Sequence, residues 1–220
     1  MDVRDAVASR FSCRAFLPTA VPLAIVREIL DRAARAPSGG NLQPWRVDAL
    51  AGEPLATLKA MMRGREAELP RGEGAEYQIY PDPLKEPFHA RRRDVGALLY
   101  AALGIPREDR PARIRQYGRN FQLFDAPVGL FVSIDRSMGP PQWSDLGGFI
   151  QTILLLERAF GLHVCAQKCG CRRAEGSRWH RESDGSEQSS NPPLHTRVQC
   201  AVRTLQPGRN TVSLCAFIFR

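Results

Sequence analysis

The stretch SRFSCRAF, residues Ser9–Phe16, places two arginines and a serine at alternate positions near the start of the chain. In an extended segment alternate side chains project to the same face, so Arg10, Ser12 and Arg14 would all reach one ligand. Guanidinium groups bind phosphate through paired hydrogen bonds, and a hydroxyl adds another donor. The opposite face carries the residues expected in the core, which are Phe11, Cys13 and Ala15. The pattern indicates an anion site, although a solvated edge with scattered arginines is the simpler interpretation of this stretch alone.

A second stretch rich in small residues, APSGGNLQPW, occupies Ala36–Trp45. Ser38 and Gly39 allow backbone N–H groups to approach a ligand closely. The amides of Asn41 and Gln43 suit hydrogen bonds to the edge of a heteroaromatic ring. A helix end and a turn before a strand would explain the same residues without a ligand, so both interpretations stay open.

Apolar periodicity predicts a mixture of helices and strands. Helices are expected over residues 2–9, 22–35, 54–65, 90–103, 106–117 and 144–160. Strands are expected over residues 45–50, 128–134, 163–166 and 211–219. The strand at 128–134, VGLFVSI, is nearly all apolar, which is typical of a strand buried on both faces.

The region between the first predicted strand and the middle of the chain contains an excursion. Residues 64 to about 88 are rich in proline, glycine and charge, which is typical of a long loop or lid. The helix expected over 90–103 is amphipathic. Its buried side is expected to carry Val95, Leu98, Leu99 and Ala102.

The chain has 220 residues and a formal net charge of +8, and most of the excess lies after Gln167. Because no aromatic side chains interleave with the basic ones, we expect no nucleic-acid partner. The sequence has no apolar run long enough to cross a bilayer and no signal-peptide pattern. We therefore expect no membrane segment and a cytoplasmic location.

The six cysteines are expected to be reduced thiols in that compartment. The spacing Cys165-x3-Cys169-x-Cys171, with His163 nearby, fits none of the common structural zinc patterns, so we expect no metal site. Cys13 has no histidine close in sequence and is a poor candidate for a nucleophile.

Taken together, the first two stretches resemble the FMN-dependent nitroreductase family. The family pattern is Arg-x-Ser-x-Arg-x-Phe, followed by Pro-Ser-x-x-Asn-x-Gln-Pro-Trp, and residues 10–16 and 37–45 match it in that order. The segments DAPVGLFVSID (125–135) and WSDLGGFIQTILLLERAFGLHVCAQ (143–167) are also similar to the family. The resemblance covers about residues 1–167.

This resemblance implies an α+β fold with a mainly antiparallel central sheet wrapped by helices. It also implies a homodimer that binds two FMN molecules at the subunit interface. Residues 1–167 would form the nitroreductase-like flavin domain.

The resemblance also assigns residues to the cofactor site. Arg10, Ser12 and Arg14, in one motif with Phe11, would hold the phosphate and ribityl end and reach the pyrimidine edge. The other subunit would supply residues that lie against the ring, namely Pro37, Ser38, Gly39 and Asn41. Gln122 resembles a polar flavin contact. Ala166 and Gln167 fall where family members present backbone to flavin N5.

The implied activity is an FMN-dependent NAD(P)H oxidoreductase that reduces nitroaromatic or quinone-like acceptors by ping-pong hydride transfer. Because the cofactor supplies the redox chemistry, no catalytic acid or base is expected among the side chains. The small-molecule acceptor would be selected by residues 64–88 and 117–124.

After Gln167 the sequence departs from the family. Residues 168–220 are rich in serine, arginine and cysteine, and only TVSLCAFIF suggests a strand. We expect an atypical tail that is either disordered or frame-shifted. The family's late basic phosphate contact has no counterpart by spacing, and neither Arg203 nor Arg209 is favoured. The alternative function is an inactive or unstable remnant that lacks the C-terminal part of the fold.

Overall fold

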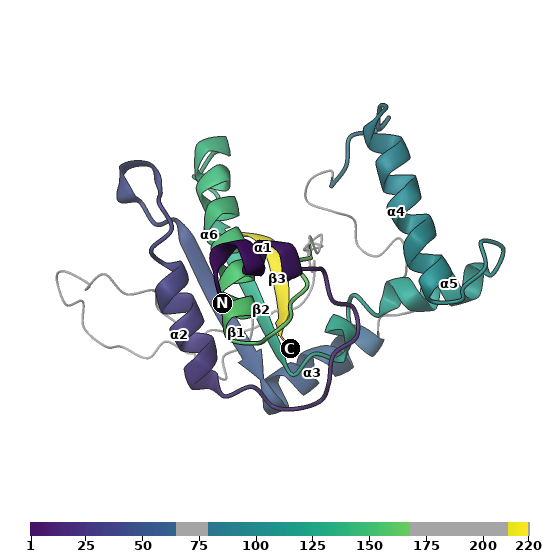
Figure 1. Ribbon diagram of the computed structural model, residues 1–220, viewed down its shortest axis with the longest axis horizontal. Helices are drawn as coiled ribbons and strands as arrows, with labels where there is room; N and C mark the ends of the chain where they lie inside the picture. Colours follow the sequence, from purple (N-terminus) through teal and green to yellow (C-terminus); the bar gives the residue numbers. More distant parts are fainter. Residues whose placement is uncertain (65–78, 168–210, 220) are drawn as a thin grey trace.

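The computed structural model describes residues 1–64 and 79–167 and the backbone of residues 211–219. Helices and a small antiparallel sheet make up this part, as expected for an α+β fold (Figure 1). The sheet contains β1 (Trp45–Ala51), β2 (Val128–Asp135) and β3 (Thr211–Phe219), in the order β1-β2-β3. No helix in the described ranges is both long and apolar enough to span a bilayer.

The central strand β2 is covered on both faces. All of its residues are buried except Phe131 and Asp135, which are half-buried. Val132 pairs with Val47 of β1 on one side and with Cys215 of β3 on the other. The strands predicted over 45–50, 128–134 and 211–219 are therefore confirmed.

One face of the sheet packs against two helices, α2 (Leu23–Ala33) and α6 (Pro140–Ala159). The Trp45 ring stacks on Phe149 of α6 with centroids 4.6 Å apart. The helix side chains that join this apolar cluster include Ile29 and Ile153, which are fully buried. This layer holds α6 in place, so the residues that follow α6 are fixed relative to the sheet.

The other face of the sheet packs against α3 (Gly52–Gly64). A second apolar cluster forms there from Leu50, Leu55, Leu123, Phe124, Ala126 and Cys165. Because Cys165 belongs to this cluster, the segment after α6 is anchored in the interior.

The first helix, α1 (Val3–Ser9), lies on α6 through the buried Ala6. Asp2 caps it, since the Asp2 Oδ1 atom accepts a hydrogen bond of 2.9 Å from the Arg4 N–H. Arg10 ends the helix in an extended conformation. The chain therefore leaves α1 through an extended Arg10, at the start of the motif of residues 10–16.

The helices α4 (Phe88–Ala102) and α5 (Arg110–Gly118) form an arm that extends from the body, at the right in Figure 1. No residue of α4 is buried, and Val95 and Leu98 are 63% and 72% exposed. The prediction that these residues face the core is wrong, because nothing in the described part of one protomer covers the apolar stripe. The helix predicted over 106–117 begins later, where Asp109 caps α5 by accepting from Ala112 N–H.

Candidate functional site

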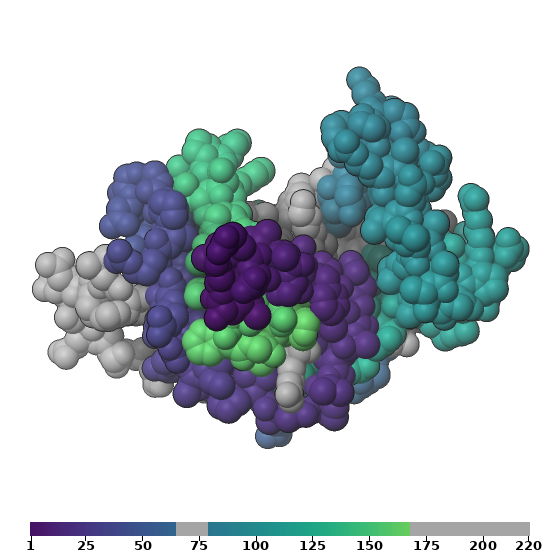
Figure 2. Space-filling view, viewed as in Figure 1, coloured from purple at the N-terminus to yellow at the C-terminus, as the bar shows by residue number. Residues whose placement is uncertain are grey.

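A single pair of backbone contacts joins the Arg10–Arg14 stretch to the segment after α6. Ser12 and Val164 form an isolated parallel bridge, and the Cys13 N–H donates to the Val164 carbonyl at 3.1 Å. The strand predicted over 163–166 is reduced to this bridge. Figure 2 shows the segment after α6 on the surface directly beside α1. The structure therefore brings Arg10, Ser12 and Arg14 close to Ala166 and Gln167 within one protomer.

The two arginines leave positive charge available at this place. Arg10 is half-buried and Arg14 is exposed, and neither takes part in an ion pair among the described residues. The Arg14 Nη1 donates only a long hydrogen bond of 3.3 Å to the Ser12 carbonyl. Burial raises the pKa of the Cys165 thiol, and Arg14 and Arg10 act in the opposite direction, which places both charges near Cys165. Two guanidiniums without a carboxylate beside an exposed serine fit an anionic group such as a phosphate.

The opposite face of the motif differs from the prediction. Phe11 is 53% exposed, and its ring rests against the His163 ring with centroids 4.9 Å apart. Ala15 is exposed and Cys13 is half-buried. The prediction that all three face the core is wrong for Phe11 and Ala15. One bridge is not a sheet, so strand alternation is not imposed on this segment.

The second stretch forms a short turn, η1 (Gly39–Asn41), between α2 and β1. The Gly39 N–H donates to the Asp145 Oδ2 of α6 at 3.1 Å, and the Ser38 Oγ accepts from the Gln43 N–H at 3.0 Å. Gly40 and Asn41 have φ angles of 58° and 55°, and glycine and asparagine adopt this left-handed region more readily than most residues. The turn is thus held by α6, while Pro37, Gly39 and Asn41 remain exposed.

The two stretches do not meet in one protomer. Figure 1 shows the turn of residues 36–45 beyond the ends of α2 and β1, away from the segment that follows α1. Within the described ranges, no hydrogen bond or ion pair joins residues 37–41 to residues 10–14. The assignment of Pro37, Ser38, Gly39 and Asn41 to the other subunit's site stays a prediction.

Gln122 is buried, and α3 holds both ends of its amide group. Its Oε1 accepts from Arg63 Nη1 at 2.9 Å, and its Nε2 donates to the Lys59 carbonyl at 3.3 Å. The next residues, Leu123 and Phe124, have φ angles of 52° and 48°, a conformation that costs about 1–2 kcal/mol per residue. Gln122 therefore supports a strained turn, and its contact with a flavin stays a prediction.

Sequence reasoning assigned no role to two residues at the end of α6. Arg158 donates hydrogen bonds to Ser9 and to Leu162, which lie shortly before Ser12 and Val164 in the sequence. Glu157 is fully buried, and neither of its carboxylate oxygens has a hydrogen-bond partner among residues 1–64 and 79–167. The only signal for Glu157 is a charged letter inside the apolar run ILLLERAF, and nothing in the sequence indicates the contact of Arg158 with Ser9, which is 149 positions away.

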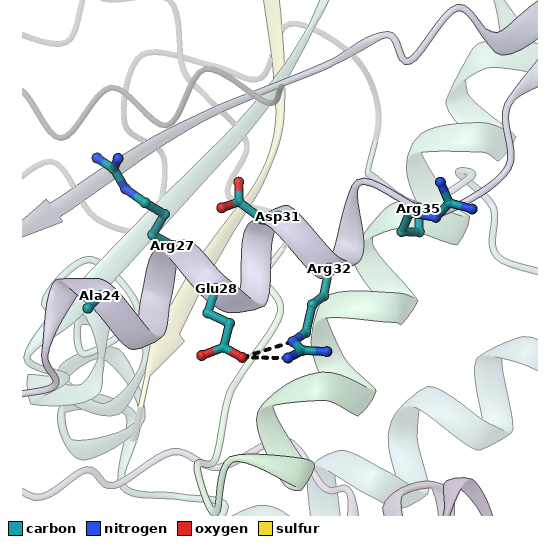
Figure 3. A pocket seen from close by; sticks show the side chains of 6 residues that line it. All are labelled: Ala24, Arg27, Glu28, Asp31, Arg32 and Arg35. Carbon is teal, nitrogen blue, oxygen red and sulfur yellow. Dashed lines mark hydrogen bonds and ion pairs between the residues drawn. The ribbon is translucent and has the colours of Figure 1, made fainter. Parts of the chain in front are cut away.

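Two surface hollows lie elsewhere. One of about 530 Å³ follows the solvent face of α2 and the Arg35 that follows it, and Arg32 pairs with Glu28 there at 2.7 Å (Figure 3). The other, of about 330 Å³, is mainly apolar and contains Lys59, whose Nζ already donates to the Ala126 carbonyl at 2.7 Å. Neither hollow contains a residue of the predicted site.

Comparisons with known proteins agree with the resemblance. The family model described as the nitroreductase family matches residues 7–174. The 4-nitrobenzoate reductase of Pseudomonas putida is 39% identical over 166 residues, which is 76% of this chain and 72% of the relative. The nitrobenzene nitroreductase of Ectopseudomonas oleovorans is 36% identical over 165 residues, covering 75% of this chain and 73% of the relative. The crystal structure of the FMN and NADPH-dependent nitroreductase NfnB from Sphigopyxis sp. strain HMH is similar with a TM-score of 0.81 and 34% identity, covering 100% of this chain and 87% of that one.

Proposed function

The chain belongs to the nitroreductase family, and from this premise we propose that it is an FMN-dependent NAD(P)H oxidoreductase that reduces nitroaromatic compounds. The observation that carries the proposal is the cluster of Arg10, Ser12 and Arg14, whose guanidiniums have no carboxylate partner in the described residues. This cluster lies beside the segment that ends in Ala166 and Gln167.

Each part of the site has a separate task. Arg10 and Arg14 bind the phosphate end of FMN, and Ser12 offers a hydroxyl to the same group. The backbone of Ala166 and Gln167 would lie against the redox-active ring. When bound, FMN supplies the hydride chemistry that links NAD(P)H to the acceptor in a ping-pong sequence. The side chains thus bind and orient, and none is needed as an acid or a base.

We further propose that the protein is a homodimer and that residues 37–41 complete the partner's site. The turn Gly39–Asn41 is held by α6 but directs no contact to the Arg10–Arg14 stretch of its own protomer. Two apolar side chains near this turn in the sequence or on α6 are exposed: Leu42, directly after it, is 54% exposed, and Trp143, two residues before Asp145, is 49% exposed. Contact with a second copy would remove this apolar surface from water.

The acceptor is a small nitroaromatic molecule, and quinone-like acceptors belong to the same proposal. Relatives of this chain are named for 4-nitrobenzoate and nitrobenzene reduction. Residues 64–88 and 117–124 would select among these acceptors. The division into a flavin domain over 1–167 and an atypical tail over 168–220, and the cytoplasmic location, also stay proposals. Limited proteolysis and cell fractionation test them.

The experiment is a flavin titration followed by turnover. The purified chain should acquire flavin absorption bands with FMN and then oxidise NADPH when 4-nitrobenzoate is added. The variant Arg10→Ala/Arg14→Ala should bind FMN at least about a hundredfold more weakly, because each charge-assisted hydrogen bond contributes roughly 1.5–3 kcal/mol. A matched control is Arg27→Ala on the solvent face of α2. A chain that takes up no flavin contradicts the proposal and supports the inactive remnant instead.

A further inference from the structure

Arg158, in the last turn of α6, connects two segments that are far apart in sequence. Its Nε donates to the Ser9 Oγ at 3.3 Å, and the two residues are 149 positions apart. Its Nη1 donates to the Leu162 carbonyl at 2.6 Å and to the His163 Nε2 at 3.3 Å. The side chain is half-buried, so these hydrogen bonds are partly shielded from water.

Two segments meet at the proposed flavin site, residues 10–14 and residues 164–167. The hydrogen-bond partners of Arg158 lie directly before each of these segments in the sequence. Ser9 directly precedes Arg10, and its hydroxyl also donates to the Asp5 carbonyl of α1 at 2.6 Å. Leu162 and His163 directly precede Val164, which forms the bridge with Ser12. A single guanidinium therefore fixes the starting points of both segments.

His163 links Arg158 to Phe11 of the motif. Burial and the Arg158 charge both lower the pKa of His163 and so favour the neutral ring. Because a guanidinium only donates, the His163 Nε2 accepts from Arg158. The proton then sits on Nδ1, which is buried and has no acceptor in the described residues. The ring also packs against Phe11, which lies between Arg10 and Ser12 in the sequence. Arg158 thus contacts Ser9, directly before the motif, and is linked through His163 to Phe11 within the motif.

We propose that Arg158 is a positioning residue that holds the phosphate cradle of Arg10, Ser12 and Arg14 in its binding geometry. The inference rests on the proposed function, because the cradle's ligand is the phosphate of FMN. Among the described residues, the Ser12–Val164 bridge alone offers one backbone hydrogen bond, which Cys13 donates. Without Arg158 the two segments would have to be ordered by the ligand itself, and this ordering weakens binding.

A purely structural role for Arg158 makes a different prediction. A cation near the C-terminus of a helix stabilises the helix dipole, and the bond to the Leu162 carbonyl closes the end of α6. Loss of that role would lower the thermal stability and weaken the binding of every flavin alike. Loss of a phosphate-cradle role would weaken the binding of FMN and spare riboflavin, which has the same ring and ribityl chain but no phosphate.

The experiment compares the dissociation constants of FMN and riboflavin, measured by flavin fluorescence, for the wild type and Arg158→Ala. We expect the variant to bind FMN about tenfold more weakly and riboflavin within about twofold of the wild type, since about 1.4 kcal/mol separates each tenfold step. The matched control is Arg32→Ala on α2, which removes the same charge from an exposed i,i+4 pair and should change neither constant. The melting temperature of the flavin-free proteins is measured in parallel.

Two further variants keep the test decisive if Arg158→Ala does not fold. Ser9→Ala removes one anchor, and His163→Phe keeps an aromatic ring against Phe11 but removes the acceptor nitrogen. Each should lower the preference for FMN over riboflavin in the same direction, and Arg158→Lys should restore part of it.

Each remaining outcome has one meaning. Equal losses for FMN and riboflavin in Arg158→Ala overturn the positioning role. Unchanged FMN binding in a folded Arg158→Ala also overturns it, while leaving the proposed function intact. A wild type that binds neither flavin contradicts the proposed function and, with it, this inference.

Discussion

Glu157 carries an ionisable group that the fold isolates from water. Its side chain is fully buried, and in the part of the chain that the structure describes both carboxylate oxygens lack a hydrogen bond. Burial therefore raises the pKa of Glu157 well above its ordinary value. The folded protein keeps this carboxyl protonated at pH values where the unfolded chain ionises it.

This burial gives the stability a definite pH dependence. Below the ordinary carboxyl pKa both states are protonated, and Glu157 causes no ionisation penalty. As the pH rises from that value towards the raised pKa of the folded state, only the unfolded chain loses its proton, so stability falls. We expect Glu157→Gln to flatten this decline in a series of thermal melts. Glu157→Leu should additionally stabilise the protein by about 1–3 kcal/mol at neutral pH, because it removes an unsatisfied buried polar group.

The matched control for this series is Glu28→Gln, which neutralises an exposed carboxylate on α2 that pairs with Arg32. Its effect on the pH profile should be small, since exposed pairs contribute little. A Glu157→Gln protein that loses stability with rising pH as steeply as the wild type would mean that another group causes the decline.

At the scale of elements, the strongly patterned segments were predictable and their surroundings were not. The apolar run at β2 and the broad apolar surface of α6 indicate their own burial, and both elements form where the sequence predicts them. The α4 stripe has equally good periodicity, yet Leu98 is 72% exposed because burial depends on what else reaches that face. The same applies to the site. Arg10 and Arg14 follow a short local pattern, whereas the proposed role of Arg158 depends on its contact with Ser9, which is 149 positions away.

The strand β3 tests whether the end of the chain belongs to the fold. Its backbone pairs with β2 from Val128↔Phe219 to Asp135↔Thr211. Removal of residues 211–220 should cost several kcal/mol, because each ladder hydrogen bond contributes about 0.5–1.5 kcal/mol. It would also expose the edge of an apolar strand to other chains. We expect a lower melting temperature and concentration-dependent aggregation, measured by calorimetry and light scattering.

Removal of Arg220 alone is the control for this truncation, because it leaves every β3 pair intact. If the protein without residues 211–220 melts like the wild type, the strand contributes nothing to stability. The alternative function, an inactive or unstable remnant that lacks the C-terminal part of the fold, would then depend on a part of the chain other than β3.

At the scale of the whole molecule, the arm of α4 and α5 has an apolar face that no other described segment of the protomer covers. Val95 and Leu98 are more than half exposed on one side of α4. We expect a second protomer to cover this side in the proposed homodimer. Leu98→Glu should then weaken dimerisation about tenfold or more, because burial of a leucine contributes about 1.5–3 kcal/mol. Sedimentation across a dilution series measures the effect.

The neighbouring exposed residue gives a control on another side of the same helix. Ala97→Glu adds the same charge about a quarter turn away and should leave the dimer largely intact. Equal weakening by both substitutions would point to general charge repulsion. No weakening by Leu98→Glu would remove the α4 face from the interface.

The distance in sequence between Ser9 and Arg158 also bears on the order in which the molecule is made. The cradle requires contacts between residues 149 positions apart, so it cannot form until most of the chain has left the ribosome. Closing so long a loop has an entropic cost that local elements such as α1 and α2 do not bear. The proposed flavin site is therefore a late product of folding, and the uptake of FMN by a newly synthesised chain would report that Ser9 and Arg158 have met.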